Sequence, residues 1–213
     1  MLGRGQAVRH RFLVAAFGGS NPPTPAKELN MSDFLNKYKS VYNVFLDNWD
    51  YQSHYVMFLE KLLYKKTILP THIKEMIFAY ISSLNGCIYC KNIHAEIAKE
   101  LIEEIKISSP LEDISMSSIE RDYKAILKLA HKVNEELESI NQNDVDEILE
   151  NGFPENVISE VIAICSAAQY MNTTVKAHNI PALNDNMNAA SVKMMIQKGY
   201  QGLAEYMINR RNK

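Results

Sequence analysis

Residues 75–94 read Glu75-Met-Ile-Phe-Ala-Tyr-Ile-Ser-Ser-Leu-Asn-Gly-Cys87-Ile-Tyr-Cys90-Lys-Asn-Ile-His94. Before residue 85, apolar residues recur every three or four positions, which predicts an amphipathic helix. Asn85–Gly86 is a helix-stop signal, and a second helix can start at Cys87. The pattern therefore predicts two helices in direct succession, with two cysteines in the first turn of the second one.

The spacing of these residues favours thiol chemistry. Cys87, Cys90 and His94 stand at positions i, i+3 and i+7, so they share one helix face. Cysteines at i and i+3 place their Cα atoms about 5–6 Å apart, within the range that a disulfide needs. A helix start favours a thiolate, and His94 can take or relay its proton. Glu75 belongs to the preceding helix and reaches His94 only if the two helices form an antiparallel hairpin.

The rest of the chain from Ser32 onward has the same helical spacing, and no alternating run longer than a few residues predicts a strand. Apolar stripes predict helical segments over residues 34–49 and 55–63, and further helices are expected over 71–84, from 87 towards 105 and over 187–207. Three more helices are expected: one capped by Ser117 and Glu120, a short one capped by Asn143 that stops at Asn151–Gly152, and one led by Pro154. The predicted fold class is all-α, a helical bundle.

Composition and charge exclude several functional classes. Hydrophobic residues make up 46% and charged residues 23% of the chain, as is typical of a soluble globular protein. The net charge of −2 gives no sign of a nucleic-acid partner, and no apolar run is long enough to span a bilayer. Three cysteines are too few for a secreted disulfide scaffold, which predicts a cytoplasmic location without membrane contact.

Residues 1–30 differ from the remainder, because they are basic and rich in glycine and proline, and their first acidic residue is Glu28. We expect a disordered leader, a tag or an over-long start, with the natural chain beginning at Met31; a basic targeting peptide is the alternative. Residues 31–213 are then a single all-α domain. The segments 75–94 and 160–178 both run from a glutamate to a histidine, which is either a degenerate internal repeat or coincidence.

The order Glu, eleven residues, Cys, two residues, Cys, three residues, His resembles the signature of the alkylhydroperoxidase D (AhpD)-like branch of the carboxymuconolactone decarboxylase superfamily. Glu75, Cys87, Cys90 and His94 match it position for position. The resemblance implies a helical bundle that assembles into trimers or hexamers. It also implies that Cys90 is the peroxide-attacking thiolate, Cys87 the resolving thiol, and Glu75 with His94 the proton relay.

By the same resemblance, the enzyme has no tightly bound cofactor, and an external dithiol such as a lipoyl group reduces the Cys87–Cys90 disulfide. Founding members often carry histidine just before the second cysteine, where this chain has Tyr89. That departure leaves the substrate open between a small peroxide and a disulfide. In disulfide reduction, Cys87 could be the attacking sulfur.

Other interpretations of the motif remain. The two thiols could be inert core residues, or could hold zinc with His94 and a fourth ligand such as Glu75 or Cys165. Cys165 itself is expected to be an inert core thiol. A lyase acting on a carboxylated lactone would use His94 or Glu75 as acid and base. A redox-sensing oligomer would respond to oxidation without turnover.

Overall fold

The computed structural model describes residues 34–35, 37–102 and 121–211. The chain divides into two units, residues 1–34 and 35–213, and all helices named below belong to the second unit. Among the described residues every regular element is helical and none is a strand, which confirms the all-α prediction. The expected leader over residues 1–30 and the expected cap at Ser117 and Glu120 lie outside the described residues.

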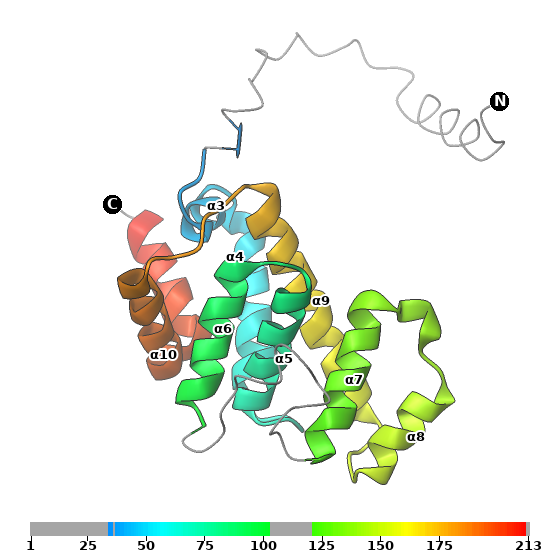
Figure 1. Cartoon of the computed structure of the whole chain (residues 1–213). Helices are drawn as coiled ribbons and strands as arrows, with labels where there is room; N and C mark the ends of the chain where they lie inside the picture. Colours follow the sequence, from blue (N-terminus) through cyan, green and yellow to red (C-terminus); the bar gives the residue numbers. More distant parts are fainter. Residues whose placement is uncertain (1–33, 36, 103–120, 212–213) are drawn as a thin grey trace, which may run out of the picture. The chain divides into compact units, whose positions relative to one another are not determined.

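Figure 1 shows the helices coloured in chain order from blue to red. In chain order they are α3 (Val41–Asp47), α4 (Trp49–Leu59) with its π-helical continuation η1 (Glu60–Tyr64), α5 (Thr71–Leu84), α6 (Ile88–Glu100), α7 (Arg121–Glu135), the 3₁₀ turn η3 (Leu137–Ser139), α8 (Gln142–Glu150), α9 (Asn156–Ala177) and α10 (Asp185–Arg211). The predicted helix over 71–84 coincides with α5. The apolar stripe expected over 34–49 is divided, because Trp49 begins α4.

Helix α5 is the central helix of this unit. It packs most extensively against α6 and next against α9. Ten consecutive residues, 73–82, are buried, so α5 is covered on every side. A helix that is buried all round has no solvent-facing stripe. Glu75 must therefore lie in the interior, where a carboxylate needs a partner.

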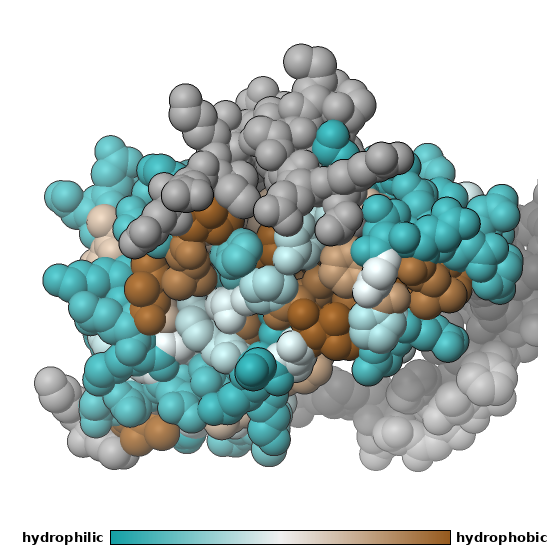
Figure 2. Space-filling view, turned by 90° about the horizontal axis from the view of Figure 1, so that it is seen from below, coloured by the Kyte–Doolittle hydropathy of each residue, from teal (hydrophilic) through white to brown (hydrophobic). Residues whose placement is uncertain are grey.

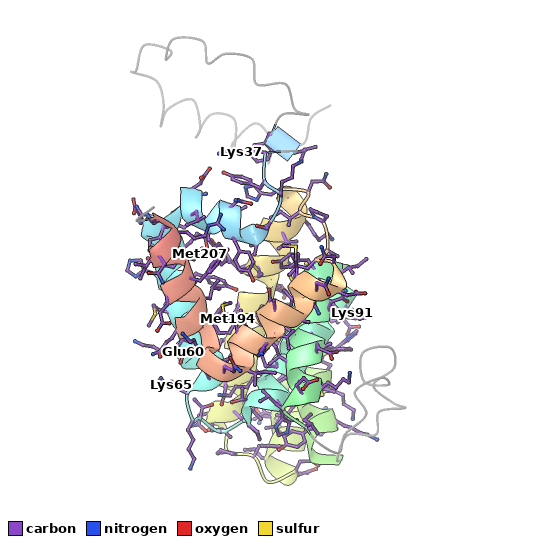
Figure 3. The ribbon with its side chains drawn as sticks, turned by 90° about the vertical axis from the view of Figure 1, so that its left-hand side faces the viewer. Lys37, Glu60, Lys65, Lys91, Met194 and Met207 are labelled. Carbon is purple, nitrogen blue, oxygen red and sulfur yellow. The ribbon has the colours of Figure 1, made fainter. Side chains whose placement is uncertain are left out.

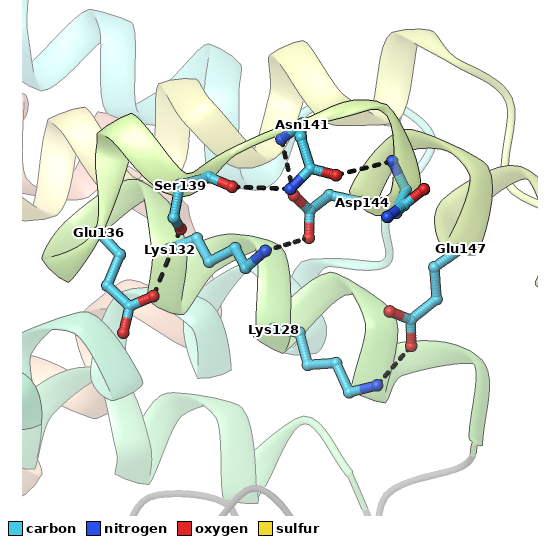
Figure 4. Close-up of polar contacts among 8 residues, drawn as sticks. Lys128, Lys132, Glu136, Ser139, Asn141, Asp144 and Glu147 are labelled. Carbon is cyan, nitrogen blue, oxygen red and sulfur yellow. Dashed lines mark hydrogen bonds and ion pairs between the residues drawn. The ribbon is translucent and has the colours of Figure 1, made fainter.

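Helix α8 begins one turn after η3 and is fixed by a capping box (Figure 4). The Asn141 side chain accepts the Asn143 N–H at 3.0 Å, and the Asp144 carboxylate accepts the Asn141 N–H at 2.9 Å. The prediction that Asn143 is the cap was wrong, because Asp144 completes the reciprocal pair only with Asn141. Ion pairs between α7 and α8 are Lys128–Glu147 and Lys132–Asp144. The predicted stop at Asn151–Gly152 is confirmed.

Helix α10 covers the predicted helix over 187–207, but it bends sharply at Gly199, which the sequence pattern did not predict. Gly199 has φ 60° and ψ −158°, a conformation open essentially to glycine alone. The carboxylate of Glu60 accepts the N–H groups of Tyr200 at 2.9 Å and Gln201 at 3.3 Å. Figure 3 shows Glu60 at the bend between the two halves of α10. Glu60 thus caps the second half of α10 from a distant part of the chain.

The two segments of the possible internal repeat have different structures. Glu75 and His94 lie on two helices, α5 and α6, whereas Glu160 and His178 lie near the two ends of the single helix α9. Glu160 forms an ion pair with the buried Lys74 ammonium at 3.3 Å. The second segment therefore does not reproduce the carboxylate–imidazole arrangement of the first.

The surface of the described residues carries both apolar and hydrophilic side chains. Figure 2 shows apolar residues between hydrophilic ones on the face seen from below. The exposed large hydrophobic side chains include Ile88, Tyr51 and Leu137. In the described ranges, no helix combines the length and the apolar character needed to cross a bilayer.

Candidate active site

The connection between α5 and α6 positions both cysteines. Gly86 has φ +63°, the left-handed conformation that ends many helices. The N–H of Cys87 donates to the carbonyl of Ser82 at 2.8 Å, and the N–H of Gly86 donates to the carbonyl of Ser83 at 3.0 Å. These two bonds form a Schellman cap. Because the cap ends α5 immediately before the N-cap of α6, the two helices form the hairpin that Glu75 needs to reach His94, and Cys87 is that N-cap.

The two thiols of the motif are in direct contact. Cys87 Sγ and Cys90 Sγ are 2.8 Å apart, and both residues are free thiols. Each residue is only 2% exposed, so neither thiol is more accessible than the other. Because the sulfurs already touch, a disulfide between them requires little movement of the backbone.

The hydrogen bond between the two sulfurs shifts the pKa values of Cys87 and Cys90 in opposite directions. The hydrogen bond with Cys90 lowers the pKa of Cys87, and the positive charge of Lys176 acts in the same direction. The same hydrogen bond, together with burial, raises the pKa of Cys90. Cys87 is therefore the favoured thiolate, while Cys90 keeps the shared proton in the resting pair.

The hairpin of α5 and α6 also brings Glu75 and His94 into contact. Glu75 Oε2 and His94 Nδ1 are 2.5 Å apart, and both side chains are buried. The His94 ring stacks on Phe78, with ring centroids 3.7 Å apart. This contact and the carboxylate fix the plane of the imidazole, so its other nitrogen has a defined direction.

A small cavity adjoins Cys90 and His94. Its volume is about 40 Å³, and apolar side chains from α3, α4, α5, α6, α9 and α10 form most of its wall. Tyr42, Tyr89 and Tyr200 contribute aromatic rings, whereas Cys87 does not line it. Sequence reasoning missed Tyr42 and Tyr200. The glycine at position 199, inside the predicted helix over 187–207, was the local signal that could have marked Tyr200.

The residues proposed as alternative zinc ligands do not form a single cluster that could hold a metal ion in the described part of the chain. Cys165 lies on α9, is fully buried, and contacts the carbonyl oxygen of Ala130 at 3.8 Å. Burial raises its pKa to about 12, which fits the expected inert core thiol. Within residues 34–35, 37–102 and 121–211, no group of three or more His, Cys, Asp or Glu side chains could hold a metal ion.

No protein-family model and no curated relative matches this sequence. Several solved structures do resemble it. An AhpD-core protein from Ralstonia eutropha JMP134, described as an uncharacterized peroxidase-related protein, superposes with a TM-score of 0.64 at 18% identity, covering 79% of this chain and 96% of that one. A peroxidase-related protein from Silicibacter sp. TM1040 gives 0.61 at 18% identity, covering 80% and 98%. The debrominase Bmp8 gives 0.57 at 17% identity, covering 76% and 86%.

The solved structures and the sequence motif agree on the arrangement of the helices. The identities are low, so the likeness concerns the arrangement of helices rather than the chemistry. The Glu–Cys–Cys–His spacing had predicted the same arrangement independently of any structure. The chain therefore has the helical fold of these AhpD-core and peroxidase-related structures.

Proposed function

We propose that this protein is a thiol-dependent oxidoreductase in which Cys87 and Cys90 cycle between a dithiol and a disulfide. The observation that carries the proposal is the 2.8 Å contact between their sulfurs beside the Glu75–His94 pair. Two thiols in contact form a disulfide readily, and a neighbouring imidazole and carboxylate can move the protons that this requires. The fold shared with peroxidase-related proteins supports the same class of reaction.

Peroxide reduction is the first candidate reaction. Cys90 lines the cavity, so its sulfur attacks the terminal oxygen of a hydroperoxide after passing its proton to Cys87 or His94. The O–O bond breaks, the leaving oxygen takes a proton to become an alcohol, and Cys90 becomes a sulfenic acid. Cys87 then attacks the Cys90 sulfur and expels water. In sum, two thiols and one hydroperoxide give a disulfide, an alcohol and water.

Glu75 and His94 serve this cycle as a proton relay. The buried carboxylate holds Nδ1 of the imidazole, which leaves Nε2 available to accept or return a proton at the cavity. An external dithiol, of the lipoyl type, returns the pair to its reduced state by thiol–disulfide exchange. We further propose that the working form is a cytoplasmic homo-oligomer, a trimer or hexamer.

Disulfide reduction is the second candidate reaction, and the lowered pKa of Cys87 favours it. Cys87 is the favoured thiolate, yet it does not line the cavity. A thiolate that does not line the cavity is not placed to attack a peroxide bound there. In this reaction Cys87 attacks one sulfur of the substrate, and Cys90 resolves the mixed disulfide.

The test is a titration of free thiols in the reduced protein, first after one equivalent of hydrogen peroxide and then after a dithiol. The wild type should lose two thiols and regain both, with mass spectrometry assigning the bridge to Cys87 and Cys90. Cys90→Ser should abolish catalytic turnover of a hydroperoxide by the dithiol, whereas Cys165→Ser, a buried thiol remote from the motif in sequence, should retain it. Unchanged turnover in Cys90→Ser would rule out the assignment.

A small aliphatic disulfide separates the two candidate reactions. If the second reaction operates, Cys90→Ser should trap a stable mixed disulfide on Cys87, because the resolving sulfur is missing. Wild-type protein that reacts quickly with the disulfide and slowly with peroxide would favour disulfide reduction. The opposite order of rates would favour the peroxidase.

A further inference from the structure

Two tyrosines that line the cavity beside Cys90 have hydroxyl groups that nothing in the described part of the chain engages. Three tyrosines line it, and Tyr42 differs from the other two because its hydroxyl is hydrogen-bonded to Ser191 Oγ at 2.8 Å. The hydroxyl oxygens of Tyr89 and Tyr200 are buried and have no hydrogen-bond partner among the described residues. A buried hydroxyl without a partner is costly, so such groups mark a place where a ligand or water belongs.

Both hydroxyls are suited to donate rather than to accept. Burial is the main cause that raises the pKa of Tyr89 and of Tyr200 well above the usual value. The nearby Glu75 carboxylate adds to this effect at Tyr200. Each phenol therefore keeps its proton at neutral pH and can offer it to an oxygen atom in the cavity.

The volume of the cavity limits what can accept these hydrogen bonds. A single water needs about 10–15 Å³ of such space, so the cavity of about 40 Å³ has room for about three atoms of that size. The remaining wall is mostly apolar, with His94 and Cys90 as the other reactive groups. A peroxide group with a short alkyl substituent matches this size and polarity, whereas a bulky hydroperoxide does not fit without enlargement.

We propose that Tyr89 and Tyr200 donate hydrogen bonds to the peroxide group of hydrogen peroxide or a short alkyl hydroperoxide bound in this cavity, and thereby stabilise its leaving oxygen. This inference rests on the proposed peroxidase function and adds two residues outside the Glu–Cys–Cys–His motif. When Cys90 Sγ bonds to the terminal oxygen, the electron pair of the O–O bond moves to the other oxygen. The phenols stabilise that developing negative charge until it takes a proton, which yields an alcohol or water.

The experiment compares two reactions of the same thiol pair in Tyr89→Phe and Tyr200→Phe. One is single-turnover oxidation of the reduced protein by hydrogen peroxide, which has an oxygen leaving group. The other is alkylation by iodoacetamide, which has none. Each substitution should slow peroxide oxidation about tenfold, as expected for one lost hydrogen bond in the transition state. Alkylation rates and their pH midpoint should stay within about twofold and a few tenths of a pH unit.

Tyr64→Phe is the matched control. Its hydroxyl is also buried without a partner in the described part, and its ring packs edge-on against Tyr200 with centroids 5.6 Å apart, but it does not line the cavity. Peroxide oxidation should be unchanged in this variant. An equal loss in Tyr64→Phe, or an equal slowing of alkylation in the cavity variants, would show that the tyrosines act on packing or thiolate formation and would overturn the inference.

The remaining outcomes are also decisive. Wild-type protein that reacts with peroxide, together with unchanged rates in Tyr89→Phe and Tyr200→Phe, overturns this inference and leaves the proposed function standing. Wild-type protein that does not react with peroxide overturns this inference together with the peroxidase reaction, and leaves disulfide reduction as the candidate function. Cumene hydroperoxide, which is bulky, should oxidise the wild type more slowly than hydrogen peroxide, and equal rates would contradict the size limit.

Discussion

At the scale of single residues, Lys176 shows how a distant side chain adjusts the cysteine pair. It lies at the C-terminal end of α9, and its ammonium donates to the carbonyl oxygen of Asn85 at 2.7 Å. That bond keeps a positive charge at the α5–α6 hairpin, where it lowers the pKa of Cys87. The N-cap position of Cys87 favours the thiolate as well.

Lys176→Met should raise the pKa of Cys87, because a charge that stabilises the thiolate is removed. Lys176 is exposed, so solvent screening limits the shift to at most about 1 pH unit. The measurement is the pH midpoint of iodoacetamide alkylation in the reduced protein. Lys176→Arg keeps the charge and should retain the wild-type midpoint. A midpoint that stays constant in Lys176→Met would show that the hydrogen bond with Cys90 alone sets the acidity.

Glu75→Gln should impair proton movement at the site while preserving its shape. Glutamine can still accept a hydrogen bond from His94 Nδ1, but it removes the negative charge that stabilises a protonated imidazole. We expect a raised pH midpoint for alkylation and peroxide oxidation slowed by about 10²-fold, the usual contribution of general acid–base catalysis. Circular dichroism should show unchanged helix content. Wild-type rates in a folded variant would remove Glu75 from the relay.

At the scale of elements, the bend in α10 positions one part of the cavity wall. Tyr200 follows Gly199 directly, and Glu60 accepts the N–H of Tyr200 at 2.9 Å. The second half of α10 therefore starts where Glu60 holds it, and this places the Tyr200 ring in the cavity wall. The edge-on contact with Tyr64, from η1, supports the same position.

Gly199→Ala should destabilise the protein strongly. An added Cβ would lie 2.5 Å from Glu60 Oε2, and the backbone conformation is one that alanine rarely adopts. The expected loss in the free energy of unfolding is roughly 2–4 kcal/mol, measured by urea denaturation. Gly152→Ala is the control: its φ is also positive, at +83°, but nothing lies within 4 Å of an added Cβ. Its loss should be about 1 kcal/mol, and equal losses would contradict the role of Glu60.

The same elements show how far sequence reasoning reaches. Helix α5 and the break at Gly86 were predicted because their signals are local: a helical apolar pattern, then an Asn–Gly pair. The bend in α10 was missed because Glu60 is 140 residues away from Tyr200 in the chain. The cap of α8 was misplaced because two asparagines compete for it, and the position of Asp144 decides between them. Long-range partners are what sequence patterns omit.

At the scale of the whole molecule, a buried ion pair connects the site helix to α9. Lys74, next to Glu75 on α5, is fully buried, and its ammonium contacts Glu160 at 3.3 Å and the carbonyl oxygen of Lys65 at 3.0 Å. Glu160 also accepts the Ile68 N–H at 3.3 Å and contacts the Thr67 hydroxyl. The Glu160 carboxylate thus binds both α5 and the segment that precedes α5.

Glu160→Gln should leave the Lys74 ammonium buried and unpaired, with a loss of about 3 kcal/mol in the free energy of unfolding. Burial already lowers the pKa of Lys74, and removal of Glu160 lowers it further. The unfolded chain then binds the proton more tightly than the folded one, so the stability of the variant should rise with pH towards the ordinary lysine value. Urea titrations at several pH values measure this. Lys74→Met in the same background should remove the pH dependence, and its persistence would point to another group.

Oxidation should leave the size of the molecule unchanged. The sulfurs are already 2.8 Å apart within a buried hairpin, so closing the disulfide moves few atoms and leaves the surface of the described helices as it is. A redox sensor that signals through its oligomer needs the opposite, a large shift between two packed states. Sedimentation of the reduced and oxidised protein should therefore give one mass, that of a trimer or hexamer in both states, with turnover above background. A mass that changes on oxidation, with peroxide turnover at background, would replace the enzyme with a sensor.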